Sequence, residues 1–141
     1  MTHLKAKDDT ATRGNRRDGA SRIRELVENW AMAVRNEDMD GVLAHHADDV
    51  VMFDVPPPLQ ARGLAEYKKT WELFFSFQGK GAFDLRELEI AAGDRVAFCH
   101  CLVTRGSIDK EGQFDVRLTI GLRKIEGDWI ITHEHHSVPA E

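Results

Sequence analysis

Residues 131–139 read ITHEHHSVP and place three histidines within four positions near the end of the chain. Successive side chains of a β-strand point to opposite faces of the sheet. His133 and His135 are therefore expected on one face, and Glu134 and His136 on the other. The proline that follows cannot donate a ladder hydrogen bond. This stretch is predicted to be the last strand of a sheet.

The same two-residue period runs backwards through the second half of the chain. It predicts strands over residues 83–91, 95–106, 113–125 and 129–138, separated by turn-like segments rich in Gly and Asp. These strands form an antiparallel meander. An additional strand is predicted over 49–55, where three consecutive prolines stop it.

The first half of the chain has a helical period. Apolar residues recur every three or four positions over residues 21–36, and a short helix is predicted over 38–47 with Asp40 as its cap. A third helix follows Gly63, with an aromatic stripe made of Leu64, Tyr67, Trp71, Phe74 and Phe75. Segregated helices and antiparallel strands indicate an α+β fold with the helices on one face of the sheet.

Composition limits the classes of function. The chain has 141 residues and a formal charge of -5, which predicts one domain over 21–141, preceded by a flexible arm over 1–20, and no nucleic-acid partner. No stretch is apolar enough to cross a bilayer. Cys99 and Cys101 are interpreted as buried hydrophobes on one strand face, which favours a reducing, cytoplasmic location.

Three segments give the chain a family resemblance: DDVVMFDVPPPLQARGLAEY (48–67), VRLTIGLRKIEGDW (116–129) and ITHEHHSVP (131–139). Together with the order of elements, they resemble the nuclear transport factor 2-like (NTF2-like) superfamily, and within it the SnoaL-like, ketosteroid-isomerase-like proteins. The resemblance covers about residues 21–139.

This resemblance implies a cone-shaped NTF2-like, or cystatin-like, fold in which three N-terminal helices pack on a strongly curved, mostly antiparallel sheet. It also implies an apolar cavity and a homodimer that forms through the open sheet. It does not imply one reaction, because a fold hosts many chemistries.

Four residues are candidates for proton transfer. Asp54 ends an apolar strand where a cavity mouth is expected; it is either a base or a turn cap. His100 lies between apolar residues and is expected to be at least half buried, with either a structural or a catalytic role. His133 and His135 could chelate a metal, but no third ligand has a sequence signature, so no metal is predicted.

The hairpin after residue 125 decides what these two histidines face. A three-residue loop pairs Arg117 with Ser137 and Thr119 with His135, whereas a two-residue loop shifts the register by one. The resulting polar face is either the pocket or the dimer interface.

We expect a small apolar organic ligand and no cofactor, with substrate contacts from Trp71, Phe75, Arg117 and Trp129. The leading hypothesis is an isomerase, cyclase or dehydratase that acts by proton transfer. The alternative is a non-enzymatic ligand-binding or dimerisation module.

Overall fold

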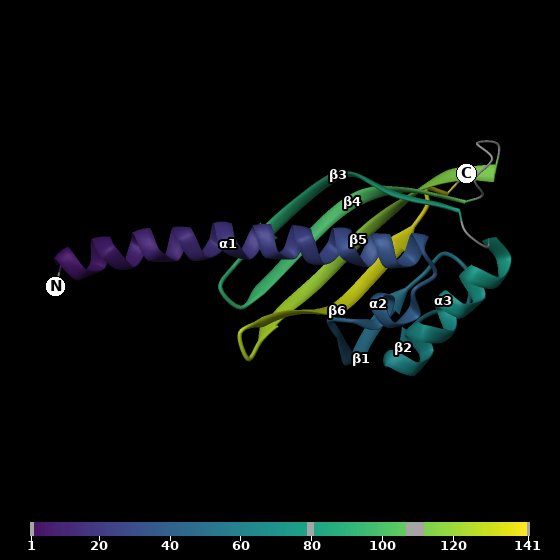
Figure 1. Ribbon diagram of the computed structural model, residues 1–141, viewed down its shortest axis with the longest axis horizontal. Coiled ribbons are helices and arrows are strands. Elements are labelled where there is room, and N and C mark those ends of the chain that lie inside the picture. Colours follow the sequence, from purple (N-terminus) through teal and green to yellow (C-terminus); the bar gives the residue numbers. More distant parts are fainter. Residues whose placement is uncertain (1, 79–80, 107–111, 141) are drawn as a thin grey trace.

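The computed structural model describes residues 2–78, 81–106 and 112–140, with side chains from Asp18 onward. Three helices and a sheet make up the described part (Figure 1). The helices are α1 (Thr2–Arg35), α2 (Met39–Leu43) and α3 (Leu64–Gln78), and the strands are β1 (His46–Phe53), β2 (Ala61–Arg62), β3 (Ala82–Ala92), β4 (Val96–Gly106), β5 (Gln113–Ile125) and β6 (Asp128–Ser137).

The strands form one sheet in the order β2-β1-β6-β5-β4-β3. β3 to β6 are the predicted antiparallel meander, and β2 is antiparallel to β1. β1 runs parallel to β6, with Phe53 opposite His135. This parallel pair brings a strand from the first half of the chain beside the last strand.

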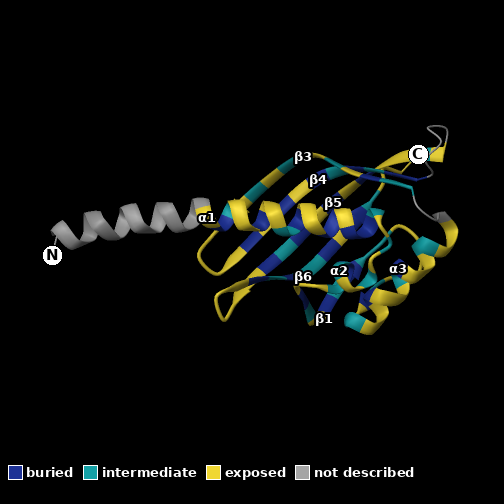
Figure 2. Ribbon diagram, in the orientation of Figure 1, coloured by how far each residue is buried: buried dark blue, intermediate teal, exposed yellow. Residues whose placement is uncertain are grey.

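The helices cover one face of the sheet. In Figure 1, α1 lies across β3 to β6, while α2 and α3 lie at the β1 side. The apolar stripe of α1 is buried against the sheet and its other side is exposed (Figure 2). Ile23 and Val27 in α1, and Tyr67 and Trp71 in α3, are all nearly inaccessible. The predicted α+β architecture is confirmed.

A β-bulge corrects the hairpin prediction. The loop has two residues, since Ile125 pairs with Asp128, yet Thr119 pairs with His135 as the three-residue alternative required. Both results hold because Gly121 pairs with His133 while the next residue pairs with Ile131, which leaves Thr132 as an extra residue in β6. An extra residue on one strand reverses which side chains face inward from that point onward.

Some boundaries differ from the prediction. α1 begins at Thr2 instead of near residue 21, and the arm over 1–20 stays a prediction because the side chains of 2–17 are not described. Asp38, not Asp40, caps α2, accepting a hydrogen bond from the Gly41 amide at 3.2 Å. The turn predicted between β4 and β5 lies mostly outside the described residues.

Cys99 and Cys101 lie on the inner face of β4, buried and free, as predicted. Burial raises the pKa of the Cys99 thiol to about 12 and that of Cys101 to about 11, which keeps both thiols protonated at neutral pH. Within the described residues, none of the helices is long and apolar enough to span a membrane.

Candidate functional site

A buried carboxylate lies at the centre of the space between the sheet and the helices. The Glu134 side chain in β6 is fully buried and takes part in three hydrogen bonds. Its Oε2 atom lies 2.6 Å from the Tyr67 hydroxyl, which donates, and 2.7 Å from His46 Nε2. Its Oε1 atom lies 3.1 Å from His136 Nε2. Partners from β1, α3 and β6 thus meet at one carboxyl group.

The bulge in β6 explains why this glutamate faces inward. Before the bulge, Trp129 and Ile131 are buried; after it, Glu134 and His136 are buried, and His135 is exposed. If Thr132 were a regular member of the ladder and no bulge existed, uninterrupted alternation from Ile131 would turn His135 inward and Glu134 outward. Thr132 therefore determines which side chains enter the interior.

The hydrogen bonds define the charge of the Glu134–His46 pair. His46 Nδ1 lies 2.9 Å from the Ala44 carbonyl oxygen, which can only accept, and Nε2 faces the Glu134 carboxylate. Both ring nitrogens of His46 therefore carry hydrogens. Burial raises the pKa of the Glu134 carboxyl, but the hydrogen bonds and charges of His136 and His46 outweigh it and hold the pKa at about 2. The result is a buried ion pair.

Tyr67 completes this cluster from the helix side. Its hydroxyl donates to Glu134 and accepts a hydrogen bond from Trp30 Nε1 at 3.1 Å. Burial and the neighbouring Glu134 carboxylate raise the pKa of this phenol well above its usual value of 10. Tyr67 therefore remains a neutral donor at physiological pH.

His136 is the member of the cluster with an unused ring nitrogen. Its Nδ1 atom is buried and has no hydrogen-bond partner. The ring packs against Trp71 and Trp30, with centroids 5.9 and 6.4 Å apart. Because Glu134 is a carboxylate, the hydrogen of the His136–Glu134 bond belongs to Nε2, and a neutral His136 then carries a lone pair on Nδ1. In its neutral form the ring is an oriented proton acceptor; in its charged form, whose attraction lowers the pKa of Glu134, Nδ1 carries a hydrogen.

A second charged pair lies on the inner face at the open end of the sheet. Arg105 at the end of β4 is 6% exposed, and its Nη1 atom is 3.8 Å from Asp54 Oδ1. The Asp54 oxygen also accepts a hydrogen bond from the Val55 amide at 2.8 Å. The guanidinium lies over the Phe74 ring at 4.7 Å. Burial lowers the pKa of Arg105, and the Asp54 charge opposes that effect.

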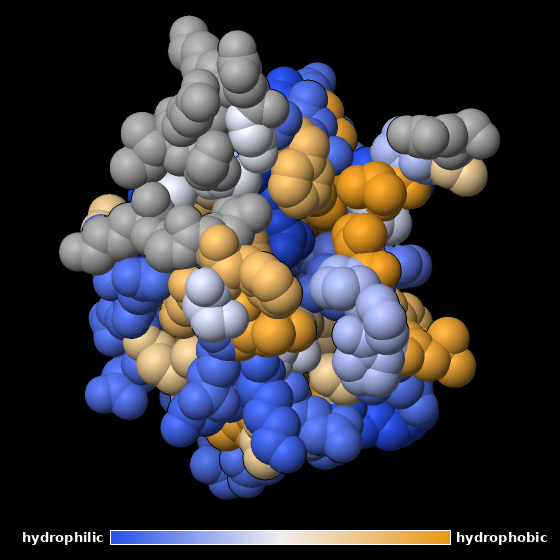
Figure 3. Space-filling model, turned by 90° about the vertical axis from the view of Figure 1, so that its right-hand side faces the viewer, coloured by the Kyte–Doolittle hydropathy of each residue, from blue (hydrophilic) through white to orange (hydrophobic). Residues whose placement is uncertain are grey.

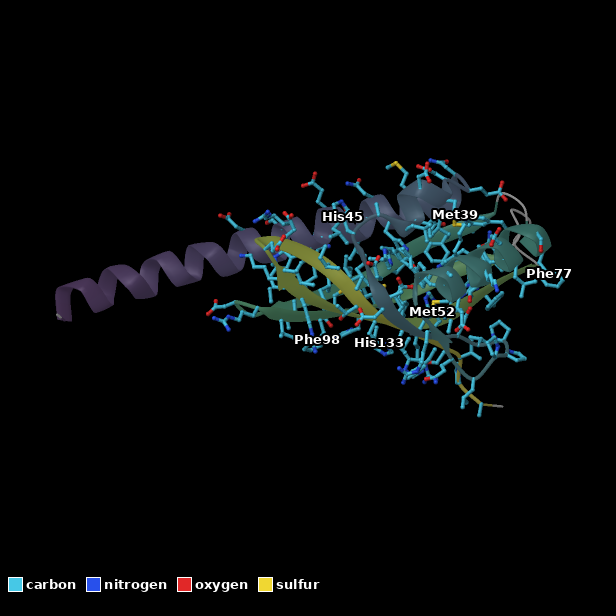
Figure 4. All side chains as sticks on the ribbon, turned by 90° about the horizontal axis from the view of Figure 1, so that it is seen from below. Met39, His45, Met52, Phe77, Phe98 and His133 are labelled. Carbon is cyan, nitrogen blue, oxygen red and sulfur yellow. The ribbon has the colours of Figure 1, made fainter. Side chains whose placement is uncertain are left out.

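The structure separates the four residues predicted to transfer protons. Asp54 lies on the inner side, 3.8 Å from Arg105 Nη1, and its predicted place at a cavity mouth stays a prediction. His133 and His135 lie on the outer face of the sheet, and Figure 4 shows His133 on the side away from α1. His133 Nδ1 donates to the Val51 carbonyl at 2.7 Å. The catalytic roles of these residues stay predictions.

His100 corrects one expectation. Its side chain is 51% exposed and lies on the outer face, 3.6 Å from Glu89, instead of being at least half buried. The apolar residues that flank it in β4 divide between the two faces: Cys99 and Cys101 point inward, whereas Phe98 is exposed beside it. Alternation, and not the local apolar composition, decides the burial of His100.

The predicted substrate contacts are also dispersed. Trp71 and Phe75 lie together in the interior, with ring centroids 6.3 Å apart. Arg117 lies on the outer face and donates to the Ser137 hydroxyl at 3.1 Å. Trp129 is buried at the β5–β6 hairpin, distant along β6 from His136. Of these four residues, Trp71 contacts the buried cluster through Tyr67 and His136, and Phe75 packs against Trp71.

The sequence interpretation did not select five residues of this site: His46, Tyr67, Arg105, Glu134 and His136. Signals existed for two of them: Tyr67 belongs to the aromatic stripe of α3, and Arg105 follows Cys99 and Cys101 at two-residue steps and shares their face. No comparable signal exists for Glu134, since its orientation depends on the bulge.

Metal coordination finds no support among the described residues, in which no group of three His, Cys, Asp or Glu side chains has a suitable arrangement. The cavities characterised in this part of the chain lie at the periphery. One of 210 Å³ lies between the three prolines and α3, and one of 410 Å³ lies on the outer face beside His100 and Arg117.

Comparison with known proteins identifies the fold. A sequence profile of the SnoaL-like domain matches residues 23–141. An NTF2-like protein of unknown function from Pseudomonas putida is similar, with 36% identity and a TM-score of 0.82, over 86% of this chain and 87% of that one. A search of curated proteins found no match.

Two more distant structures show the same fold. A protein with a cystatin-like fold from Nostoc punctiforme has 18% identity and a TM-score of 0.73, over 86% of this chain and 92% of its own. A ketosteroid isomerase-like protein from Erwinia carotovora atroseptica has 20% identity and a TM-score of 0.68, over 86% and 96%.

Proposed function

Since this chain belongs to the SnoaL-like domain family, we propose that it binds a small organic molecule at the open end of its interior and catalyses a proton transfer on it. The family membership agrees with the resemblance found in the sequence and supports a small-molecule-binding domain. The observation that carries the reaction type is the unpartnered, buried Nδ1 atom of His136.

His136 acts as the general base in this proposal. Its Nε2–H donates to Glu134, which fixes the ring orientation and favours the positive ring that forms when Nδ1 takes up a proton. The surrounding Trp30 and Trp71 rings exclude water and hold the imidazole in place. Glu134 is a positioning residue, because both of its oxygens already accept hydrogen bonds, from Tyr67 and His46 at Oε2 and from His136 at Oε1.

The reaction that suits this arrangement is a proton shift next to a carbonyl group. Nδ1 removes a proton from the carbon beside the carbonyl, and the C–H electron pair moves into an enolate. The protonated ring exchanges this proton with solvent and then delivers a proton to another carbon of the enolate. Asp54 is a second candidate proton acceptor. Phe53 pairs with His135 in the parallel ladder, and Asp54 and His136 are the residues that follow this pair.

Deuterium exchange tests this proposal. We would incubate the protein in D₂O with 3-cyclohexenone and follow exchange and double-bond migration by proton NMR. His136→Gln should lower the rate about a hundredfold, in the range expected for loss of a general base. Glu134→Gln should shift the pH profile of the rate, as expected of a residue that acts through His136.

His133→Gln and His135→Gln provide the matched comparison, because both residues lie on the opposite face of the same strand. They should retain the wild-type rate. If His135→Gln loses activity at unchanged thermal stability while His136→Gln retains it, the base is on the outer face and this proposal is wrong.

A homodimer is the second element of the proposal, and the exposed apolar side chains on the outer face favour it. Val96 is 62% exposed and Phe98 51% exposed. Figure 4 shows Phe98 on the same side of the sheet as His133. Exposed apolar residues grouped on one sheet face suit a contact with a second copy. If catalysis is absent, a dimeric ligand-binding module is the function that remains.

A further inference from the structure

The least satisfied charged group in the described part of the chain is the Arg105 guanidinium. We propose that Arg105 binds a carboxylate of the ligand, so that the substrate class is small carboxylic acids with an apolar body. This inference names the substrate class for the proposed interior site and therefore rests on the proposed function.

The hydrogen-bond donors of Arg105 carry the inference. Its side chain is 7% exposed, and its Nε and Nη1 atoms are buried without a hydrogen-bond partner. Asp54 forms an ion pair with it, but the 3.8 Å separation of Nη1 and Oδ1 is too long for a hydrogen bond. Buried donors without partners are rare in folded proteins and need an explanation. An acceptor supplied by a ligand provides one.

The surroundings of Arg105 indicate the rest of the ligand. The centroids of the Phe74 and Phe114 rings lie 4.7 and 5.9 Å from its guanidinium carbon. The Phe114 residue is 44% exposed. Aromatic rings around a buried charge favour a ligand whose body is apolar or aromatic. Figure 3 looks onto this end of the molecule, where strongly hydrophilic atoms lie in a hollow between hydrophobic side chains.

The charge balance favours a carboxylate over a phosphate. Arg105 presents one positive charge, and Asp54 already places one negative charge beside it. A monoanion adds little repulsion, whereas a dianion adds more. A planar carboxylate also matches the fork of a guanidinium group. Anchoring at Arg105 would hold the ligand beside Asp54, the residue that follows the Phe53–His135 pair of β1 and β6.

Binding measurements test the inference. We would titrate the wild-type protein with benzoate and butyrate, and with benzamide as the uncharged match for benzoate, and follow the Arg Nε–H resonances of ¹⁵N-arginine-labelled protein. A buried Nε–H resonance that disappears in Arg105→Gln should shift with benzoate and butyrate but not with benzamide. Arg105→Gln should weaken benzoate binding about tenfold or more, the effect of losing a charged hydrogen bond.

Arg123→Gln is the matched control, since Arg123 is exposed on β5; it should bind benzoate as the wild type does. Should Arg105→Gln fail to fold, the comparison of acid with amide in the wild type decides. The inference is overturned if neither acid binds, if benzamide binds as tightly as benzoate, or if benzoate binds without shifting the resonance assigned to Arg105.

His136→Gln separates this inference from the proposed function. It should retain benzoate binding, because the anchor is Arg105, while losing proton exchange. If carboxylates bind through Arg105 but no ketone is exchanged, the anion site is upheld and the proton-transfer proposal falls. If exchange occurs but carboxylates do not bind, the proton-transfer proposal is upheld and the anion site at Arg105 is wrong.

Discussion

His46 Nε2 and Glu134 Oε2 lie 2.7 Å apart, although 88 positions separate the two residues in the sequence, and both side chains are fully buried. The contact joins the first residue of β1 to the last strand of the sheet. It is a charged pair that exists only in the completed fold. Loss of either residue should therefore strongly lower the free energy of unfolding of the protein.

Removal of one partner tests this dependence. His46→Ala should lower the free energy of unfolding by about 3–5 kcal/mol, because it leaves the Glu134 carboxylate buried with one partner fewer. Urea unfolding followed by tryptophan fluorescence measures the loss. His100→Ala, at an exposed histidine, should change stability by less than about 0.5 kcal/mol. Equal effects of the two substitutions would contradict the charged pair.

The depressed pKa of Glu134 predicts an acid-dependent stability. Because this pKa is about 2 in the folded state and 4.5 is the ordinary value, the unfolded chain binds the proton first as the pH falls. Stability should therefore decrease between pH 4.5 and about 2, by an amount on the order of 3 kcal/mol. Glu134→Gln, measured by urea unfolding at each pH, should be less stable than the wild type at pH 7 and should lack this contribution. If the free energy of unfolding of the wild type and of Glu134→Gln changed equally between pH 4.5 and about 2, the depressed pKa of Glu134 would be refuted.

Tyr67 offers a spectroscopic test, since it is the single tyrosine of the chain. Its raised pKa means that the phenol stays neutral in the folded state when an unfolded tyrosine ionises near pH 10. Absorbance at about 295 nm should therefore rise only as the protein unfolds, and stability should fall as the pH increases above about 10. Ionisation near pH 10 in the folded protein, shown by unchanged circular dichroism, would argue against the buried cluster.

The outer face predicts the oligomeric state. Phe98→Asp should shift sedimentation toward monomer, because a charge in an apolar contact between copies is desolvated and unpaired. Arg117→Ala and His135→Ala should act in the same direction but more weakly. Leu73→Asp, at a residue that is 48% exposed on α3, is the matched control on another surface. Wild-type protein that sediments as a monomer at micromolar concentration would exclude the homodimer.

The sequence predicted the fold well because the apolar periods are local and strong. The strands predicted over 83–91 and 113–125 became Ala82–Ala92 and Gln113–Ile125. β2 was missed, since its two residues, Ala61 and Arg62, pair with β1 but have no periodic pattern of their own. The early start of α1 was missed because residues 2–20 lack an apolar stripe.

The site was predicted less well because its residues are chosen by tertiary structure. Glutamate and histidine are mostly exposed in proteins, so no local pattern placed Glu134 and His136 in the interior. Asp54 was selected because a strand end marks it, and its predicted role stays a prediction. Its partner Arg105 is evident only in the folded structure, where Arg105 Nη1 at the end of β4 lies 3.8 Å from Asp54 Oδ1.

The extra residue Thr132 also affects how this strand can be compared with its relatives. A relative that lacks a residue at this position would have to carry its buried acid and histidine one place earlier relative to Trp129. A gap-free alignment would then match its buried residues to His133 and His135, which here lie outside. Before the bulge, equivalent positions should therefore be counted forward from the β5–β6 hairpin. After the bulge, they should be counted backward from the end of β6.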